Sequence, residues 1–454
     1  MEIDALRRRL TGKITIKGDD AYAGLTAAFN LAVTASPAVI VEARDAQDVA
    51  EAVRFASAEG LAVAVQATGH GLAESLDGAL LVHTGRLDEC VVHPEERWAR
   101  VGAGVRWQQV LDAAAPHGLA ALSGSAPGVG VVGYTTGGGL GPVGRSFGWA
   151  SDRVRAIELV TGDGVLRRVT AQDEPDLFWA VRGGKGALGI VTALEFDLIA
   201  QPTLYAGALY FDGADTAAVV HAWRDWSATL PIEATTSLAL LQLPALPGIP
   251  EPLAGKFSVA VRFAWTGALP DGESALAPMR EIAKPVIDAV QTIPYAAIGM
   301  IHNDPTDPMP VHEGAELLHD LPTEAVDALL AVAGPAAGSP QVIVELRHLG
   351  GALAEPPTYP SALCHRDAAF SLITIGVLAP PIADAVASHA GRVSEAMAPW
   401  TTGGVLPNLA AGVGEERIAR SYDPETLARL LALAEQYDPA NVLRAGQVPV
   451  RAAS

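Results

Sequence analysis

Short apolar runs and stretches of helical period alternate over the first two hundred residues. Residues 37–43 (PAVIVEA) form a β-branched apolar run, residues 45–60 repeat apolar positions with a helical period, and residues 61–67 (LAVAVQA) are apolar again. An aspartate at the start of the middle segment and a glycine at its end are typical helix boundaries. The pattern therefore predicts a βαβ unit over these three segments.

Similar patterns continue further along the chain. Residues 98–104, 105–118 and 119–124 repeat the order of apolar run, amphipathic stretch and apolar run, and predict a second βαβ unit. Residues 153–170 carry Gly-Asp-Gly between two apolar runs, which is typical of a β-hairpin, and residues 186–200 predict a long strand.

The character of the chain changes after about residue 204, where strands and helices become longer and loops become acidic and proline-rich. A chain of 454 residues is long enough for two packed cores. We expect a first domain over residues 1–203, a second over residues 204–400, and a C-terminal segment over residues 401–454 that returns to the first domain through the helix PETLARLLALAEQY.

Composition narrows the classes of function. Half of the residues are hydrophobic, only 18% are charged, and the formal net charge is −20. A chain this acidic repels nucleic acid and anionic membranes, so we expect neither as a partner. Cys90 and Cys364 make no disulfide framework, and no apolar run has the length of a membrane span or a signal-peptide core. We therefore expect a cytoplasmic protein, as a monomer or a homodimer.

Glycine-rich segments carry the candidate chemistry. In residues 65–71 (VQATGHG), His70 lies between glycines after an apolar strand, where backbone N–H groups can approach a pyrophosphate. Taken alone, this segment fits an ordinary turn with a surface histidine better. Residues 124–148 hold ten glycines in twenty-five residues. That density is incompatible with a regular helix or strand, and it predicts a loop laid against a large, flat polyphosphate cofactor.

The second segment also contains the pattern GxGxxG, at Gly128, Gly130 and Gly133. In dinucleotide-binding folds the third glycine opens a helix, whereas YTTGGGLGP follows here. We therefore do not expect a nicotinamide dinucleotide site.

Together with ALGIVTALEF and the ending YDPANVLR, the two glycine-rich segments resemble the vanillyl-alcohol-oxidase superfamily, and within it berberine-bridge-enzyme-like and 6-hydroxynicotine-oxidase-like flavoproteins. The resemblance covers nearly the whole chain. It implies an α+β fold, with a PCMH-type FAD-binding domain of two α/β subdomains and a substrate domain whose antiparallel sheet is covered by helices. It also implies FAD as the cofactor, bonded through its 8α-methyl group to His70.

The same resemblance implies further residues around the cofactor. Residues 182–192 would place backbone near the flavin, although a glycine-rich turn into a core strand is the alternative, and the Asp-Pro pair of the ending could simply stop a helix. The residues expected to bind FAD are Ala67, Thr68, Gly69, His70, Gly71, Gly124, Ser125, Ala126, Pro127, Val129, Gly130, Gly133, Gly138, Gly139, Gly189, Ile190, Val191, Asn408 and Asn441.

Departures from the family pattern refine this expectation. Many relatives carry a second attaching cysteine directly before the proline of the long glycine segment, and here Ala126 precedes Pro127. The resemblance then implies a single attachment, through His70. Val129 stands where the oxidases of the family tend to carry valine, which favours O₂ as the electron acceptor.

The candidate catalytic residues depart from the pattern of the family's sugar oxidases. Family sugar oxidases use a tyrosine in a Y-x-N segment and an aspartate on a substrate-domain strand. Here Leu406 replaces that tyrosine and Arg347 replaces that aspartate. Glu345 and Arg347 share one face of the strand, and relatives acting on amines carry glutamate at the first position. A charge couple at a domain seam is the alternative. Tyr134 takes a position that many relatives fill with histidine, which implies a proton donor or base, with a packed aromatic as the alternative.

Other polar residues are expected to be mainly structural. His348 alternates to the other face of its strand, and His365 and Arg366 match a family signature that we interpret as structural. His302 and His312 lack metal-ligand spacing, so we predict no metal site.

We expect an FAD-dependent oxidase of a small alcohol, amine or secondary-metabolite substrate. The alternatives are a dehydrogenase with another electron acceptor, and a catalytically reduced flavin protein that serves in ligand binding or resistance.

Overall fold

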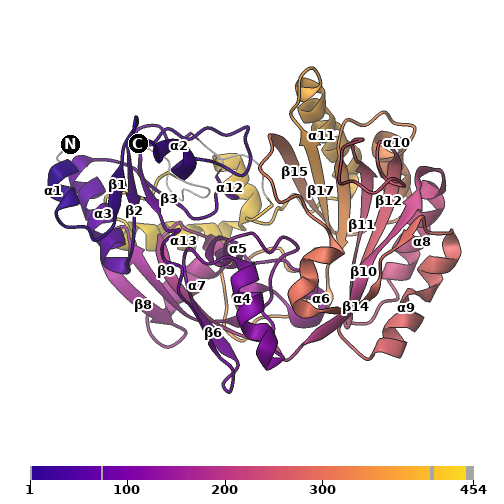
Figure 1. Cartoon of the computed structure of the whole chain (residues 1–454), viewed down its shortest axis with the longest axis horizontal. Coiled ribbons are helices and arrows are strands. Elements are labelled where there is room, and N and C mark those ends of the chain that lie inside the picture. The colour runs from indigo at the N-terminus through magenta and orange to yellow at the C-terminus, as the bar shows by residue number, and fades with distance from the viewer. Residues whose placement is uncertain (1–2, 73–74, 410–413, 446–454) are drawn as a thin grey trace.

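Three β-sheets organise the part of the chain that this computed structural model describes, residues 3–72, 75–409 and 414–445. The first two sheets lie in one half of the molecule and the third in the other half, as Figure 1 shows. The α+β class predicted from the sequence is confirmed. Within the described residues, no helix combines the length and the apolar character needed to cross a membrane.

The first sheet is small and largely parallel. Its strands, in the order β1-β2-β4-β3, are β1 (Lys13–Thr15), β2 (Val39–Glu42), β4 (Leu80–His83) and β3 (Val63–Gln66). The predicted strand, helix and strand over residues 37–67 are confirmed as β2, α3 (Ala46–Glu59) and β3, but β4 inserts between the two strands and pairs in parallel with both.

Helix α3 begins and ends where its sequence predicts. The side chain of Asp45 accepts a hydrogen bond from the backbone N–H of Asp48, and Gly60 ends the helix with φ of 69°. Val49, Val53 and other apolar side chains on one face of the helix are fully buried. This face packs in a core shared with the first sheet and with the second.

The second sheet is antiparallel. Its strands, in the order β5-β6-β9-β7-β8, are β5 (Cys90–His93), β6 (Trp98–Gly102), β9 (Gly189–Asp197), β7 (Val154–Thr161) and β8 (Leu166–Thr170). The predicted hairpin and long strand are confirmed as β7–β8 and β9. The predicted second βαβ unit is wrong. Helix α4 (Trp107–Ala114) forms, but residues 119–124 make only a bridge from Ala120 to Ile199, because β9 occupies the place beside β6.

The long glycine segment is not entirely a loop. It contains two short helices, α5 (Val131–Thr136) and α6 (Gly144–Phe147), so the loop predicted over the whole segment is wrong in these two places. Gly133 lies inside α5, where an added Cβ would meet no other atom within 4 Å. The expectation from the sequence that no helix forms at Gly133 is wrong. A nicotinamide fold still does not form, since the sheet behind this segment is antiparallel.

The third sheet has its four longer helices on one face. Its strands are β10 (Thr203–Asp212), β11 (Ala234–Gln242), β12 (Phe257–Trp265), β13 (Ile287–Asp288), β14 (Gln291–Pro294), β15 (Val311–Leu318), β16 (Ile343–His348) and β17 (Phe370–Val377). The main path runs β13-β10-β12-β11-β16-β17-β15, with antiparallel pairing throughout.

The covering helices are α8 (Thr216–Ser227), α9 (Leu269–Ile282), α10 (Thr323–Ala333) and α11 (Ala383–Met397). Alternate strand residues such as Leu238 and Leu346 pack against these helices. The helices lie on the outer side of the sheet in Figure 1, so part of the opposite face is turned toward the first half of the molecule.

The C-terminal helices pack against the first half. These are α12 (Glu415–Ser421) and α13 (Pro424–Tyr437), and α13 contacts α7 (Pro175–Gly184) in the core of the second sheet. The remaining described α-helices are the short N-terminal segments α1 (Ile3–Arg7) and α2 (Tyr22–Leu25).

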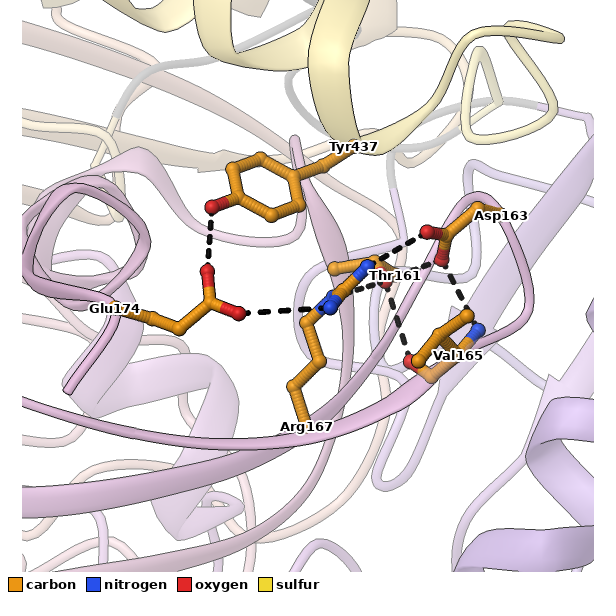
Figure 2. A network of polar contacts seen from close by, with 6 residues as sticks. All are labelled: Thr161, Asp163, Val165, Arg167, Glu174 and Tyr437. Atoms are coloured by element: carbon orange, nitrogen blue, oxygen red, sulfur yellow. Dashed lines mark hydrogen bonds and ion pairs between the residues drawn. The ribbon is translucent and has the colours of Figure 1, made fainter.

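A polar network holds the end of α13, as Figure 2 shows. The hydroxyl of Tyr437 donates to Glu174 at 2.5 Å, and Arg167 contacts Glu174 at 3.5 Å and Asp163 at 2.7 Å. Asp163 also accepts from the hydroxyl of Thr161 at 2.6 Å. The network ties the C-terminal helix to the turn between β7 and β8.

Candidate functional site

A cavity of about 540 Å³ lies between the glycine-rich loops of the first half and the open face of the third sheet. Its wall on one side is formed by the His70 turn and the long glycine segment, and on the other by residues of β15, β16 and β17. This volume is within the range of sites that bind cofactors and drug-sized ligands.

His70 lies on the cavity wall, in the loop between β3 and β4. Its ring stacks on Phe29, with centroids 4.1 Å apart and planes inclined by 18°, and Nδ1 lies 2.9 Å from the hydroxyl of Thr68. Burial, together with the charge of Arg106, lowers the pKa of His70 to about 4. The imidazole is therefore neutral at pH 7 and held in one orientation.

The long glycine segment lets backbone and side chains approach closely. A Cβ on Gly137 would lie 2.1 Å from Oδ1 of Asn408 and 2.6 Å from Cε of Lys185. The side-chain amide of Asn408 donates to the carbonyl of Tyr134 at 2.7 Å. A side chain at position 137 would displace Asn408 or Lys185, both of which lie on the cavity wall.

Tyr134 reaches the cavity from α5. Its ring meets Trp107 edge to face, with centroids 5.5 Å apart, and its hydroxyl is buried without a hydrogen-bond partner among the described residues. Burial, with a smaller effect from Tyr295, raises the pKa of Tyr134 well above 10. The side chain is thus both a packed aromatic and a neutral hydroxyl available to a ligand.

Glu345 is surrounded by donors. Its Oε1 accepts from Arg262 at 2.6 Å and from the hydroxyl of Ser237 at 2.8 Å, and lies 3.4 Å from Nε2 of His302. Its Oε2 accepts from Nε of Arg347 at 2.9 Å. Although burial opposes ionisation, the two guanidinium groups and His302 together hold the pKa of Glu345 well below 4.5.

This cluster results from strand register. Ser237 pairs with Arg347 across β11 and β16, and with Arg262 across β11 and β12, so the three side chains share one face of the sheet. A carboxylate held this firmly in its ionised form is a weak base. We therefore interpret Glu345 as the centre of a charge cluster with Arg262, Arg347 and His302, and not as a proton acceptor.

Other ionisable side chains on the cavity wall have different surroundings. Lys185 is buried in the turn after α7, and burial, with a smaller effect from Arg417, lowers its pKa to about 7. Asp304 and Glu313 also line the cavity and make no hydrogen bond or ion pair within the described ranges.

Most residues predicted from the sequence lie on the cavity wall. They are Ala67, Thr68, Gly69, His70, Gly71, Gly124, Ser125, Ala126, Val129, Gly130, Gly133, Tyr134, Gly139, Gly189, Val191, Glu345, Arg347 and Asn408. The structure thus brings the His70 turn, the long glycine segment and the Glu345 strand together around one space, although they are far apart in the sequence.

Several predicted FAD-binding residues lie behind the wall. Pro127 packs near Gly299, and Gly138 approaches Leu363. Ile190 belongs to the buried core of the first sheet, because it points to the opposite side of β9 from Gly189 and Val191. Asn441 lies in a turn, where its carbonyl accepts from Arg444. These four residues do not line the cavity, and their predicted role in binding FAD stays a prediction.

The residues predicted to be structural have structural contacts. Arg366 donates to Asp152 at 2.7 and 2.9 Å, and Nε2 of His365 lies 2.9 Å from the carbonyl of Arg420. His348 lies close to Arg145 and stacks on Phe370. Cys90 and Cys364 are free thiols that do not line the cavity.

Sequence reasoning missed other wall residues, among them Phe29, Lys185, Arg262 and Glu313. Two of these had a signal, since Lys185 interrupts a glycine turn and Arg262 interrupts the apolar strand FSVAVRFAW. Phe29 and Glu313 had none, because only tertiary packing brings them to the cavity.

Comparisons with known proteins agree with this geometry. Residues 37–170 match the FAD binding domain family. The chain is 28% identical to (R)-6-hydroxynicotine oxidase from Paenarthrobacter nicotinovorans over 433 residues, 90% of each chain. It is 31% identical to the FAD-dependent monooxygenase tpcD from Cochliobolus heterostrophus over 210 residues, 45% of this chain and 40% of the other.

A solved structure extends the match to three dimensions. The crystal structure of 6-hydroxy-D-nicotine oxidase from Arthrobacter nicotinovorans superposes with a TM-score of 0.85 at 25% identity, covering 96% of this chain and 97% of that one. These likenesses agree with the resemblance to the vanillyl-alcohol-oxidase superfamily that the sequence motifs carry. The chain is an FAD-dependent oxidoreductase. Xylooligosaccharide oxidase from Myceliophthora thermophila C1 shares the fold, with a TM-score of 0.86 at 20% identity.

The cavity has features that fit FAD. Its glycine-rich wall leaves space where side chains would otherwise lie, as at Gly133, and its volume suits a dinucleotide. Oε1 of Gln66 and the hydroxyl of Tyr134 are buried and lack partners within the described part of the chain, although both residues line the cavity. Such unpaired polar atoms are the donors and acceptors that a polar cofactor would satisfy.

Proposed function

We propose that this oxidoreductase is an oxidase that holds FAD through a single covalent bond from His70. It would oxidise a small amine or alcohol substrate and pass the electrons to O₂. The observation that carries the proposal is His70 itself, which is neutral, stacked on Phe29 and placed on the wall of the glycine-lined cavity. A neutral imidazole is the nucleophilic form, so the side chain is ready to form a bond without first losing a proton.

Single attachment is supported by Ala126. This residue lies on the cavity wall, where a cysteine could otherwise reach a ligand, and neither Cys90 nor Cys364 lines the cavity. Val129, also on the wall, supports the choice of O₂ as acceptor through the family resemblance. The likeness to (R)-6-hydroxynicotine oxidase over 90% of the chain supports an amine or alcohol as substrate.

Residues on the cavity wall opposite the His70 turn would contact the substrate. Bound FAD would supply the hydride acceptor, which no side chain provides. We propose that Arg347 and the hydroxyl of Tyr134 contact the substrate, because both lie on the cavity wall and Tyr134 has an unused hydroxyl. Glu345 would orient Arg347 through the hydrogen bond at 2.9 Å and would not itself accept a proton.

The covalent bond is tested by acid precipitation of the His70→Ala protein. In the unmodified protein we expect the yellow colour to stay with the precipitate. In His70→Ala it should pass into the supernatant, while His117→Ala, at an exposed position that does not line the cavity, should behave like the unmodified protein. Colour that remains with precipitated His70→Ala would exclude this attachment.

The oxidase assignment needs a separate measurement. The photoreduced holoenzyme is mixed with air-saturated buffer in a stopped-flow instrument, and the return of its visible absorbance is followed. A fast return is expected for an oxidase. A slow return, with fast reoxidation by an artificial electron acceptor, would instead show a dehydrogenase.

A further inference from the structure

Glu313 is one of two cavity carboxylates, with Asp304, that make no hydrogen bond or ion pair among the described residues. It lies on β15, the edge strand of the third sheet, and pairs with Ile375 of β17, which pairs with Ile343 of β16. All three side chains line the cavity. Glu313 thus stands on the same face of the sheet as Glu345, but among isoleucines instead of arginines.

The two glutamates differ in their partners. Glu345 accepts hydrogen bonds from two arginines and a serine, whereas Glu313 makes no hydrogen bond or ion pair within the described part of the chain. The carboxylate of Glu313 lies on the cavity wall, and desolvation by the surrounding protein raises its pKa. A desolvated carboxylate beside apolar walls is costly unless a cation or a donor from a ligand approaches it.

Its location defines which part of a ligand it can reach. Val311, two residues earlier on the same strand, exchanges hydrogen bonds of 2.9 and 3.0 Å with the side chain of Asn30, and the neighbouring Phe29 stacks on His70. Glu313 is therefore near the His70 end of the cavity. Two strand spacings, about 10 Å, separate it from the strand that carries Glu345.

We propose that Glu313 is a specificity-determining residue that binds the cationic nitrogen of an amine substrate. Ile343, Ile375 and Val377 provide an apolar surface for the hydrocarbon beside that nitrogen. A neutral sugar or polyol would leave the carboxylate without a counter-charge and would meet isoleucines where it needs hydrogen-bond partners. The inference rests on the proposed function, because it assigns a substrate class to the same cavity.

The test compares a cation with its uncharged analogue. The probes are N-methyl-2-phenylpyrrolidine, which is protonated at pH 7, and 2-phenyltetrahydrofuran, which has a similar shape and no charge. Binding of each to the holoenzyme is measured by isothermal titration calorimetry. The protein with native Glu313 should bind the amine at least about 10-fold more tightly than the ether, as expected for a hydrogen bond to a charged group.

Variants then locate the effect. Glu313→Gln should weaken binding of the amine by about 10- to 100-fold and leave binding of the ether unchanged, since the shape is kept and only the charge is lost. Glu313→Asp, which keeps the charge, should retain part of the preference. Glu324→Gln, an exposed glutamate at the start of α10 on the other side of the sheet, is the matched control and should bind both probes like the unmodified protein.

The outcomes separate this inference from the proposed function. Equal binding of the two probes before substitution, or equal weakening of both in Glu313→Gln, would overturn the role of Glu313. Acid precipitation of the same samples reports on the cofactor bond. If the flavin stays attached but the protein does not prefer the amine probe, only the role of Glu313 is rejected. If the unmodified protein releases its flavin, the covalent bond to His70 is rejected, and the probe comparison still decides the role of Glu313.

Discussion

Replacing Glu345 by glutamine tests the interpretation of the charge cluster. The substitution keeps the size of the side chain and one acceptor oxygen, but it removes the negative charge between Arg262 and Arg347. The side chains of Glu345 and Arg262 are each only 5% exposed, so solvent cannot replace the lost counter-charge. Two positive charges would then face each other across a buried site.

The size of the effect follows from these contacts. Two unit charges in contact attract by about 4 kcal/mol at an effective dielectric constant of about 20. Glu345 has two such partners, at 2.6 and 2.9 Å, and the cost of desolvating the carboxylate offsets part of the attraction. Removing one partner of a buried pair typically costs about 3–5 kcal/mol, and we expect Glu345→Gln to lower the free energy of unfolding by that amount at pH 7.

The pH dependence provides a second measure of the same carboxylate. The folded-state pKa of Glu345 lies well below the ordinary value of 4.5. Its stabilisation is therefore fully present above about pH 4.5 and is lost as the pH falls through the folded pKa. The difference in unfolding free energy between the two proteins should be constant near neutral pH and shrink in acid.

Urea unfolding followed by tryptophan fluorescence measures this difference, with Glu324→Gln as the control for loss of an exposed glutamate. A loss below about 1 kcal/mol, the range of a surface ion pair, would refute the reasoning. So would full stability together with abolished turnover, because that combination is expected of a catalytic base.

Other substitutions test further parts of the site and fold. Gly137→Ala should reduce bound FAD, measured as the ratio of flavin to protein absorbance, because its Cβ would lie 2.1 Å from Oδ1 of Asn408; Gly391→Ala, where a Cβ meets nothing, is the control. Attachment of FAD to the apoprotein should be independent of pH above about 5 and slow toward the pKa of His70 at about 4, as the imidazole becomes protonated. Asp45→Ala should cost about 1 kcal/mol of stability in thermal unfolding, because it removes the N-cap of α3, and an unchanged midpoint would contradict this.

The sequence by itself determined the features that depend on local chemistry. Helix α3 could be predicted from its apolar period and its caps, and α13 was predicted residue for residue. The glycine-rich segments pointed to a polyphosphate cofactor because the absence of a side chain, as at Gly137, is a property of the residue itself. The place of His70 after β3 could also be predicted, because glycines flank it and an apolar run precedes it.

Tertiary structure decided what depends on register between distant strands. The insertion of β4 and the place of β9 beside β6 could not be predicted, since a short apolar run does not specify its neighbour. The partners of Glu345 come from strands up to 108 positions away, and these partners convert a candidate base into an ionised anchor. Glu313 became a candidate only when folding placed it, without a partner among the described residues, on the wall of the cavity. Electrostatic environment depends on which side chains meet in space, and only the fold determines that.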